Sequence, residues 1–283
     1  MTEIDHEPDA GDWLLFDTHA HLCDPAFEAD RDEVLERARR AGVGAIIAVG
    51  EGLQDARFNL ALAREYPWIV RAAAGLFPTN LDLGQAEELE QWIRRHADDL
   101  IAIGEVGLDF WKVEGEDDRA VQREIFERFV LLAIELDLPL NVHSRSAGAA
   151  TVELLLDSGV SRVQLHAFDG RASKALPAIE AGFFLSIPPS VVRSRQKQKL
   201  VRHVPLQNLL LETDSPVLGV EPGERNEPAN LTLALRAVAD LKGVHPQAIA
   251  EATRDNAIRL YGRALLNDES DRSGSTTGSL SAG

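Results

Sequence analysis

Eight short apolar segments recur along the chain, and longer stretches with helical periodicity separate them. Each segment is about as long as a strand and is rich in branched or aromatic residues, which is typical of buried strands. The segments are residues 14–16, 45–49, 69–74, 101–104, 140–143, 163–166, 183–187 and 209–212. Because strands that alternate with helices usually pair in parallel, this pattern predicts an α/β protein built on one parallel sheet.

The stretches between the apolar segments have the periodicity of helices. Apolar side chains three and four positions apart form a helical stripe in residues 119–136. Similar patterns cover residues 25–41, 173–181, 193–203 and 228–262. Eight strand–helix units fit a closed (β/α)8 TIM barrel in a chain of 283 residues. A doubly wound open sheet is the alternative, but the first segment leads into Asp17-Thr18-His19 and not into a glycine-rich phosphate loop.

The two ends of the chain differ in composition from the middle. Residues 1–12 are acidic and lack an apolar stretch, whereas residues 267–283 consist mostly of small and polar residues. Such composition cannot bury enough apolar surface to stabilise a fold. We therefore predict an acidic N-terminal extension at 1–12, one TIM-barrel domain at 13–266 and a disordered tail at 267–283.

Charge and cysteine content exclude several classes of protein. The net charge of −17 makes the chain a poor general binder of nucleic-acid phosphates, so any phosphate recognition must be local. Cys23 is the single cysteine, which excludes an intrachain disulfide and a thiolate metal cluster. No apolar run has the ~18 residues of a membrane helix, and no secretory signal begins the chain. We expect no membrane partner and a cytoplasmic location; nothing in the sequence indicates the oligomeric state.

Metal-type side chains recur at the C-terminal ends of the predicted strands, where the active sites of barrels lie. They are His19, His21, Glu105, His143, His166 and Asp214. Because residues i and i+2 of a strand point to the same face, His19 and His21 can reach one ion. A single such histidine is more typical of a satisfied core residue, but six candidates at one end of a barrel are not.

Imidazoles and carboxylates without thiolates suit Zn²⁺, Mn²⁺ or Mg²⁺. Six ligands exceed what one catalytic zinc needs, since such a zinc keeps a position open for water. Two divalent ions that share a carboxylate fit the set better. Such a pair can lower the pKa of a bound water, hold the substrate oxygen and stabilise the leaving group.

Five ordered motifs carry a resemblance to a known family. They are Asp17-Thr18-His19-Ala20-His21-Leu22, Gly104-Glu105-Val106-Gly107-Leu108-Asp109, Val142-His143-Ser144-Arg145, His166-Ala167-Phe168-Asp169-Gly170 and Glu212-Thr213-Asp214-Ser215-Pro216. Over about residues 14–262 the chain resembles the TatD family of metal-dependent hydrolases, amidohydrolase-like barrels that include DNases acting on strand ends. The resemblance implies a two-metal phosphodiesterase.

The family pattern also implies how the ligands divide. His19, His21 and Asp214 would hold one ion, His143 and His166 the second, and Glu105 would bridge them. Strand four offers Glu105, and no lysine follows until Lys112, which counts against the barrels that bridge their metals with a modified lysine.

The chain departs from the family pattern at two positions. Many members have Gly-x-His-Pro after strand three, where this chain has Gly75-Leu76-Phe77-Pro78. Members often have a cysteine after the strand-six histidine, where this chain has Ala167. Neither change removes a candidate ligand, but both concern how the substrate is handled.

Further roles follow for residues near the candidate ligands. Besides Glu105, Asp214 is a candidate catalytic residue that positions the attacking hydroxide or accepts its proton; the alternative is a ligand only. Arg145 shares the face of His143 and is a candidate substrate-phosphate contact, with an ion pair as the alternative. Asp109 is expected to support a ligand histidine, or else to be a solvated loop acid. The basic run 193–199 is either a DNA-backbone contact or an ordinary helix face.

Three functions compete for this site. The first is a metal-dependent DNase that cleaves phosphodiester bonds at DNA ends with water activated by two metals. The second is hydrolysis of a small ester, amide or phosphoester with the same metals, because a fold and its metal site do not fix the substrate. The third is a non-catalytic binding paralogue, which the complete ligand set disfavours.

Overall fold

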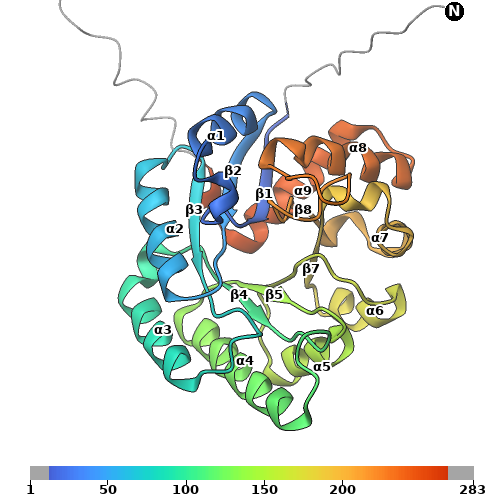
Figure 1. Cartoon of the computed structure of the whole chain (residues 1–283). Coiled ribbons are helices and arrows are strands. Elements are labelled where there is room, and N and C mark those ends of the chain that lie inside the picture. The colour runs from blue at the N-terminus through green and yellow to red at the C-terminus, as the bar shows by residue number, and fades with distance from the viewer. Residues whose placement is uncertain (1–12, 267–283) are drawn as a thin grey trace, which may run out of the picture.

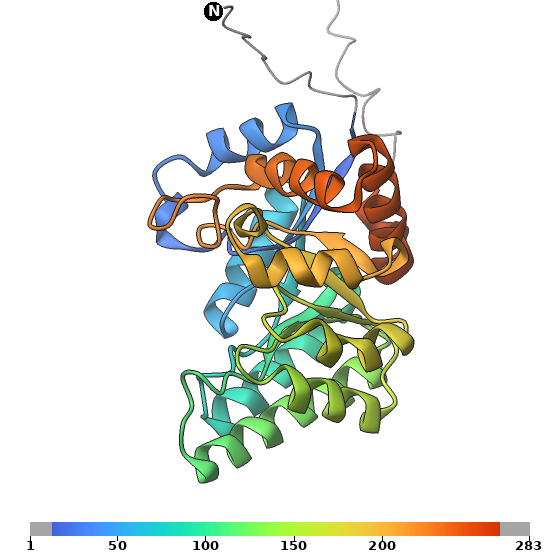
Figure 2. The same cartoon turned by 90° about the vertical axis from the view of Figure 1, so that its right-hand side faces the viewer.

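The computed structural model describes residues 13–266, so the predictions for 1–12 and 267–283 lie outside the described residues. Eight parallel strands pair in the order of the sequence, and helices surround them (Figures 1 and 2). The strands are β1 (Leu15–Ala20), β2 (Val43–Ala48), β3 (Val70–Ala74), β4 (Ala102–Gly107), β5 (Leu140–His143), β6 (Val163–Leu165), β7 (Phe184–Ile187) and β8 (Leu209–Leu211). Each falls within or beside one of the eight predicted segments, and the (β/α)8 barrel is confirmed.

Nine α-helices lie within residues 13–266. They are α1 (Arg31–Arg40), α2 (Leu53–Glu65), α3 (Leu83–His96), α4 (Glu116–Leu136), α5 (Gly148–Ser158), α6 (Ala172–Glu180), α7 (Arg195–His203), α8 (Leu231–Lys242) and α9 (Pro246–Tyr261). Helices α2, α3 and α5 are additional to the five predicted stretches. Among residues 13–266, no helix has the length and apolar character needed to cross a membrane.

Local signals shift the boundaries of three predicted helical stretches. Residues 25–41 begin with a 3-10 turn at Pro25–Phe27, and α1 starts only at Arg31. The stretch 193–203 becomes a helix after Ser194, whose side chain accepts a hydrogen bond from the backbone N–H of Lys197. Residues 228–262 hold two helices, because Gly243 adopts a φ of 66° that ends α8.

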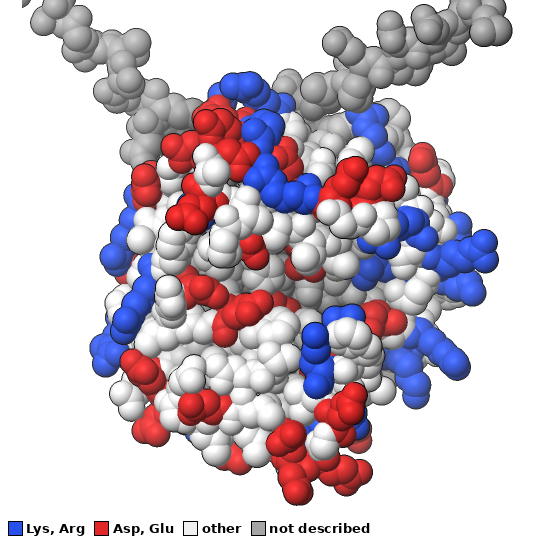
Figure 3. Space-filling model, viewed as in Figure 1, with Lys and Arg blue, Asp and Glu red and all other residues white. Residues whose placement is uncertain are grey.

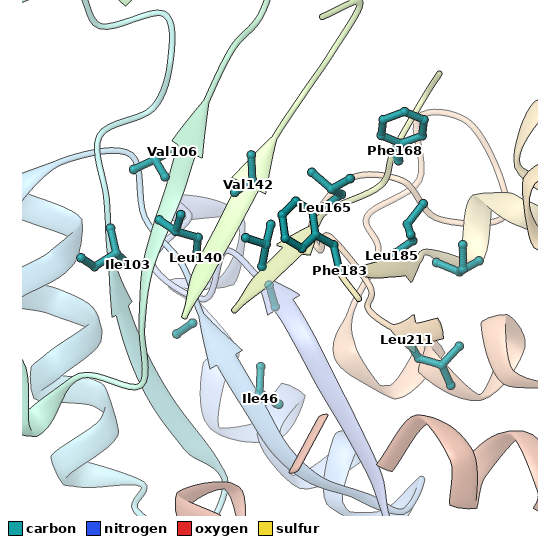
Figure 4. Close-up of a cluster of buried hydrophobic side chains, with 14 of the residues drawn as sticks. Ile46, Ile103, Val106, Leu140, Val142, Leu165, Phe168, Phe183, Leu185 and Leu211 are labelled. Atoms are coloured by element: carbon teal, nitrogen blue, oxygen red, sulfur yellow. The ribbon is translucent and has the colours of Figure 1, made fainter. Parts of the chain in front are cut away.

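The strands have two faces, and each face packs into a different apolar layer. Side chains such as Ile46, Leu140 and Leu211 lie between the strands and the surrounding helices (Figure 4). Alternate residues of the same strands form a second cluster together with α9. Its buried members are Phe16, Ala45, Ile47, Val49, Ala73, Ile101, Ala102, Phe184, Leu210, Ala257, Leu260, Tyr261 and Leu265. The period of two therefore fills the barrel interior with one set of side chains and its outside with the other.

The barrel closes between β1 and β8 through contacts that also shape one end of it. The backbone N–H of Asp214 donates to the carbonyl of His19 at 2.9 Å, and the Thr18 hydroxyl donates to the carbonyl of Leu211 at 3.0 Å. Asp17, which is fully buried, accepts hydrogen bonds from both the N–H and the hydroxyl of Thr213 at 2.8 and 2.6 Å. These bonds fix the segment after β8 directly beside the end of β1.

Candidate metal centre

The six candidate ligands converge at the C-terminal ends of the strands. His19 belongs to β1, Glu105 to β4 and His143 to β5, whereas His21, His166 and Asp214 follow β1, β6 and β8. Except for His19, which is fully buried, all of them line one cavity of about 460 Å³. Side chains separated by up to 195 positions in the sequence, from His19 to Asp214, thus face one another because parallel strands end at the same rim.

Glu105 lies at the centre of the site, and its two oxygens face different pairs of histidines. Oε2 lies 3.7 Å from His19 Nε2 and 3.4 Å from His21 Nε2. Oε1 lies 2.6 Å from His143 Nδ1 and 3.4 Å from His166 Nε2. A carboxylate placed in this way has one oxygen available to each of two ions.

Asp214 lies beside the same two histidines, His19 and His21. Its Oδ1 lies 3.5 Å from His19 Nε2 and 3.6 Å from His21 Nε2. Three groups of potential ligand atoms within 4.8 Å of one another result: His19 with His21 and Glu105, Glu105 with His143 and His166, and His19 with His166 and Asp214. The groups overlap, since His19, Glu105 and His166 each belong to two of them.

Burial and neighbouring charges set the protonation of the candidate ligands. Burial alone would raise the pKa of Glu105, but His143, His166 and His19 hold it well below its usual range. Burial works to lower the pKa of His143, yet Glu105 and Asp109 raise it to about 9. Burial and His166, whose ring stacks on that of His19 at 3.8 Å between centroids, lower the pKa of His19 to about 4. The site therefore keeps its carboxylate ionised and its histidines in different protonation states.

A second set of polar side chains holds the histidines in place. Asn141 Oδ1 lies 2.8 Å from His19 Nδ1, Glu212 Oε2 lies 3.2 Å from His166 Nδ1 and Asp109 Oδ2 lies 3.2 Å from His143 Nε2. Asp109 is thus in the contact expected from the sequence rather than a solvated loop acid. Partners of this kind fix the tautomer and orientation of a metal-binding imidazole.

Asn141 and Glu212 were not assigned roles from the sequence, although a signal for them exists. Each lies two positions before a candidate ligand: Asn141 before His143 in β5, and Glu212 before Asp214 just after β8. Gln164 stands in the same relation to His166, and all three preceding residues are fully buried. Asn141 and Glu212 each support a histidine contributed by another strand, whereas Gln164 donates to Ser186 and accepts from Tyr261.

We expect Glu212→Gln to reduce metal affinity or turnover by about 10- to 100-fold, the usual cost of losing such a supporting partner. The substitution removes the negative charge beside His166 while keeping the volume of the side chain. Titration with Zn²⁺ or Mn²⁺ followed by calorimetry measures the effect. Glu221→Gln, at an exposed position, is the matched control. Equal metal affinity in the two variants would show that Glu212 supports the fold only.

Arg145 lies at the rim of the cavity, where it makes no ion pair with any residue of the described range 13–266. Its guanidinium carbon is 3.7 Å from the centroid of the Trp111 ring. The ion-pair alternative thus has no partner among residues 13–266, and while the face of the guanidinium packs on Trp111, the N–H groups in its plane can donate to another partner. Phe77, in the place of the family histidine, packs edge-on against His143 at 5.1 Å between ring centroids.

The basic run 193–199 divides between solvent and cavity. Arg193, Arg195 and Lys199 are exposed, and basic side chains gather on the side of the molecule where α6 and α7 lie (Figure 3). Lys197 instead is only 8% exposed and lines the cavity beside His166 and Asp214. An ordinary helix face describes the exposed members of the run but not Lys197.

The chain is similar to known proteins over most of its length. The model of TatD-related DNases matches residues 16–262. The chain is 42% identical over 259 residues to human deoxyribonuclease TATDN3, covering 87% of this chain and 94% of that protein. It is 33% identical over 266 residues to the 3′-5′ ssDNA/RNA exonuclease TatD of Citrobacter rodentium, covering 89% and 99%. The crystal structure of the Escherichia coli TatD homologue YJJV superposes with a TM-score of 0.81 at 28% identity, covering 88% and 98%.

Proposed function

The chain belongs to the TatD family of metal-dependent hydrolases, and from this membership we propose that it cleaves phosphodiester bonds at DNA ends with two divalent ions. His19, His21 and Asp214 would hold one ion, and His143 and His166 the other. Glu105 would bridge them. The proposal covers the number of ions, the assignment of each ligand and the nucleic-acid substrate.

The observation that carries the proposal is the placement of the two Glu105 oxygens. Oε1 faces His143 and His166, and Oε2 faces His19 and His21. In the metal-free protein the imidazolium of His143 compensates this carboxylate, which is 1% exposed, and divalent ions would take over that role when bound. The donor set of imidazoles and carboxylates fits Zn²⁺, Mn²⁺ or Mg²⁺.

Divalent ions bound here would stabilise charge on phosphoryl oxygens and lower the pKa of water. The chain itself contributes the groups that move protons and orient the phosphate. Asp214 is buried, yet His166 and His21 keep its pKa below the ordinary value, so its carboxylate can accept a proton from the attacking water. The alternative role for Asp214 is that of a ligand only. Arg145 at the rim can bind a non-bridging phosphate oxygen with two N–H groups.

The shape of the site favours a strand end over the middle of a duplex. A cavity of about 460 Å³ lies in the usual range for small-ligand sites and admits a terminal nucleotide more readily than a continuous double helix. The relatives named as a deoxyribonuclease and as a 3′-5′ ssDNA/RNA exonuclease support a nucleic-acid substrate. The same cavity size and the net charge of −17 also favour the second candidate, hydrolysis of a small phosphoester or other ester.

An assay of DNA against small esters decides between these functions. Chelated full-length protein is supplied with Mg²⁺, Mn²⁺ or Zn²⁺ and offered labelled single-stranded and duplex oligonucleotides beside bis(p-nitrophenyl) phosphate and a panel of carboxylic esters. We expect metal-dependent shortening of single strands from one end, with activity at background after chelation with EDTA.

Each other outcome of that assay has a definite meaning. Turnover of a small ester without any cleavage of DNA would replace the nuclease by a small-molecule hydrolase. Binding of DNA without turnover of any substrate, whichever metal is supplied, would favour the non-catalytic paralogue. Full DNA cleavage in the presence of EDTA would contradict the metal dependence of the reaction.

A further inference from the structure

Lys197 is a buried cation at the active-site end of the barrel that the mechanism above does not use. It lies in the first turn of α7, and the hydroxyl of Ser194 caps its backbone N–H. The side chain is 8% exposed and lines the cavity together with His166, Asp214 and Arg145. The helix therefore directs one lysine of the basic run inward while its neighbours Arg195 and Lys199 remain exposed.

The surroundings of Lys197 leave its ammonium group only partly satisfied. Nζ donates one hydrogen bond, 2.8 Å long, to the carbonyl of Ala167. An ammonium has three N–H donors, and among residues 13–266 Lys197 has no carboxylate at salt-bridge distance. The charges of Glu212, Asp214 and Asp169 favour its protonated form from farther away, against the lowering of its pKa by burial.

Burial of an ammonium without an ion pair costs free energy, and its one hydrogen bond to Ala167 offsets that cost only in part. Five of the other residues that line this cavity are acidic, among them Asp24 and Glu51. Metal ions at the candidate site would offset that negative charge. A cation with two free N–H donors beside the ions is suited to an anion, and lysine binds phosphate well as a point charge.

We propose that Lys197 binds the phosphoryl group of the substrate through the two N–H donors that Ala167 does not use. Arg145, on the loop after β5, and Lys197, on α7, would then contact the same phosphate ester inside one cavity. The inference rests on the proposed function in one respect only, that the substrate carries a phosphate. It adds a substrate-binding residue from a helix to a site otherwise built from strand ends.

A purely supporting role for Lys197 is the competing explanation. Ala167 has a positive φ of 41°, its N–H donates to Glu212 at 2.8 Å, and its carbonyl accepts from Lys197. Lys197 could in that case serve only to hold the loop that carries His166. This explanation predicts lost metal affinity or lost thermal stability, with no specific loss of phosphate binding.

Binding of inorganic phosphate to the full-length, metal-loaded protein separates the two explanations. The variants are Lys197→Met, Lys197→Gln, which can keep the bond to Ala167 without the charge, and Lys197→Arg, which keeps the charge. We expect the Kd for phosphate to rise on the order of 10- to 100-fold in the first two, as for loss of a charged hydrogen bond. Lys197→Arg should retain most of the affinity, and the exposed control Lys199→Met should equal the wild type.

The metal content, the melting temperature and the kinetics of DNA cleavage are also measured for the wild type and each variant. The proposal requires KM to rise in Lys197→Gln at unchanged metal content. An unchanged Kd for phosphate in Lys197→Gln, or a loss that only follows a loss of metal, would overturn it. If the wild type does not cleave DNA but its phosphate binding depends on Lys197, the inference stands and the nuclease function fails. If the wild type cleaves DNA but its phosphate binding does not depend on Lys197, the nuclease function stands and this inference fails.

Discussion

Glu105→Gln is expected to lower kcat for phosphodiester cleavage by more than about 100-fold and to reduce the bound divalent ions from two to at most one. The loss of an outer partner of a ligand already costs about 10- to 100-fold, so removal of the shared ligand should cost more. The amide has one oxygen in place of the two that face His143 and His21, and it carries no charge to compensate an ion. Metal analysis of the dialysed protein and single-turnover kinetics measure both effects.

Glu51→Gln is the matched control for this change. Glu51 lines the same cavity but belongs to none of the three groups of clustered ligand atoms found among residues 13–266. Its substitution removes the same charge and should leave metal content unchanged. Retention of two ions by Glu105→Gln, or equal losses in the two variants, would contradict the bridging role. The comparison also separates a specific ligand from the general negative charge of the cavity.

The strands and the candidate ligands could be predicted from the sequence for one physical reason. Buried parallel strands give continuous apolar segments, and the first polar residues after them lie at a common rim. His143 and His166 could be placed by that rule without knowledge of any contact. Their grouping around Glu105 was implied only by the family resemblance, because spacing along one strand does not show how the ends of different strands meet.

The residues that escaped prediction are those whose role depends on tertiary packing. Asn141 supports His19, which belongs to a different strand, so spacing along its own strand reveals its face but not its partner. Lys197 is one of several cations in a basic run, and only the cap at Ser194 and the docking of α7 determine that it turns inward. For Arg145, the sequence left open two partners, while the structure shows the ring of Trp111, which is 53% exposed.

The affinity of the metal site should rise steeply with pH because a divalent ion must displace a proton from His143. In the metal-free protein both ring nitrogens face carboxylates, Nδ1 toward Glu105 and Nε2 toward Asp109. These carboxylates raise the pKa of His143 to about 9 against the opposing effect of burial. Below that pH each ion bound at His143 releases at least the proton of His143, and His166, whose pKa is also raised, can add to it, so the association constant should increase at least about tenfold per pH unit and level off once both are neutral.

The stability of the metal-free protein should change with pH in the opposite direction. A histidine whose pKa is raised on folding adds stability that is complete below its unfolded pKa of about 6.5 and disappears as the pH rises through about 9. His19 makes no such contribution in this range, since its pKa is lowered to about 4 and it is already neutral.

Zn²⁺ titrations between pH 6 and 10, in buffers of different ionisation enthalpy, measure both the affinity and the protons released. Asp109→Asn removes one of the two carboxylates beside His143, so the plateau should move to lower pH. The expected order of events is then fixed by the site itself: His143 is held as an imidazolium by Glu105 and Asp109 until an ion replaces its proton. An affinity at the His143 site that does not change between pH 6 and 9 would contradict this coupling and would place the proton elsewhere in the cluster.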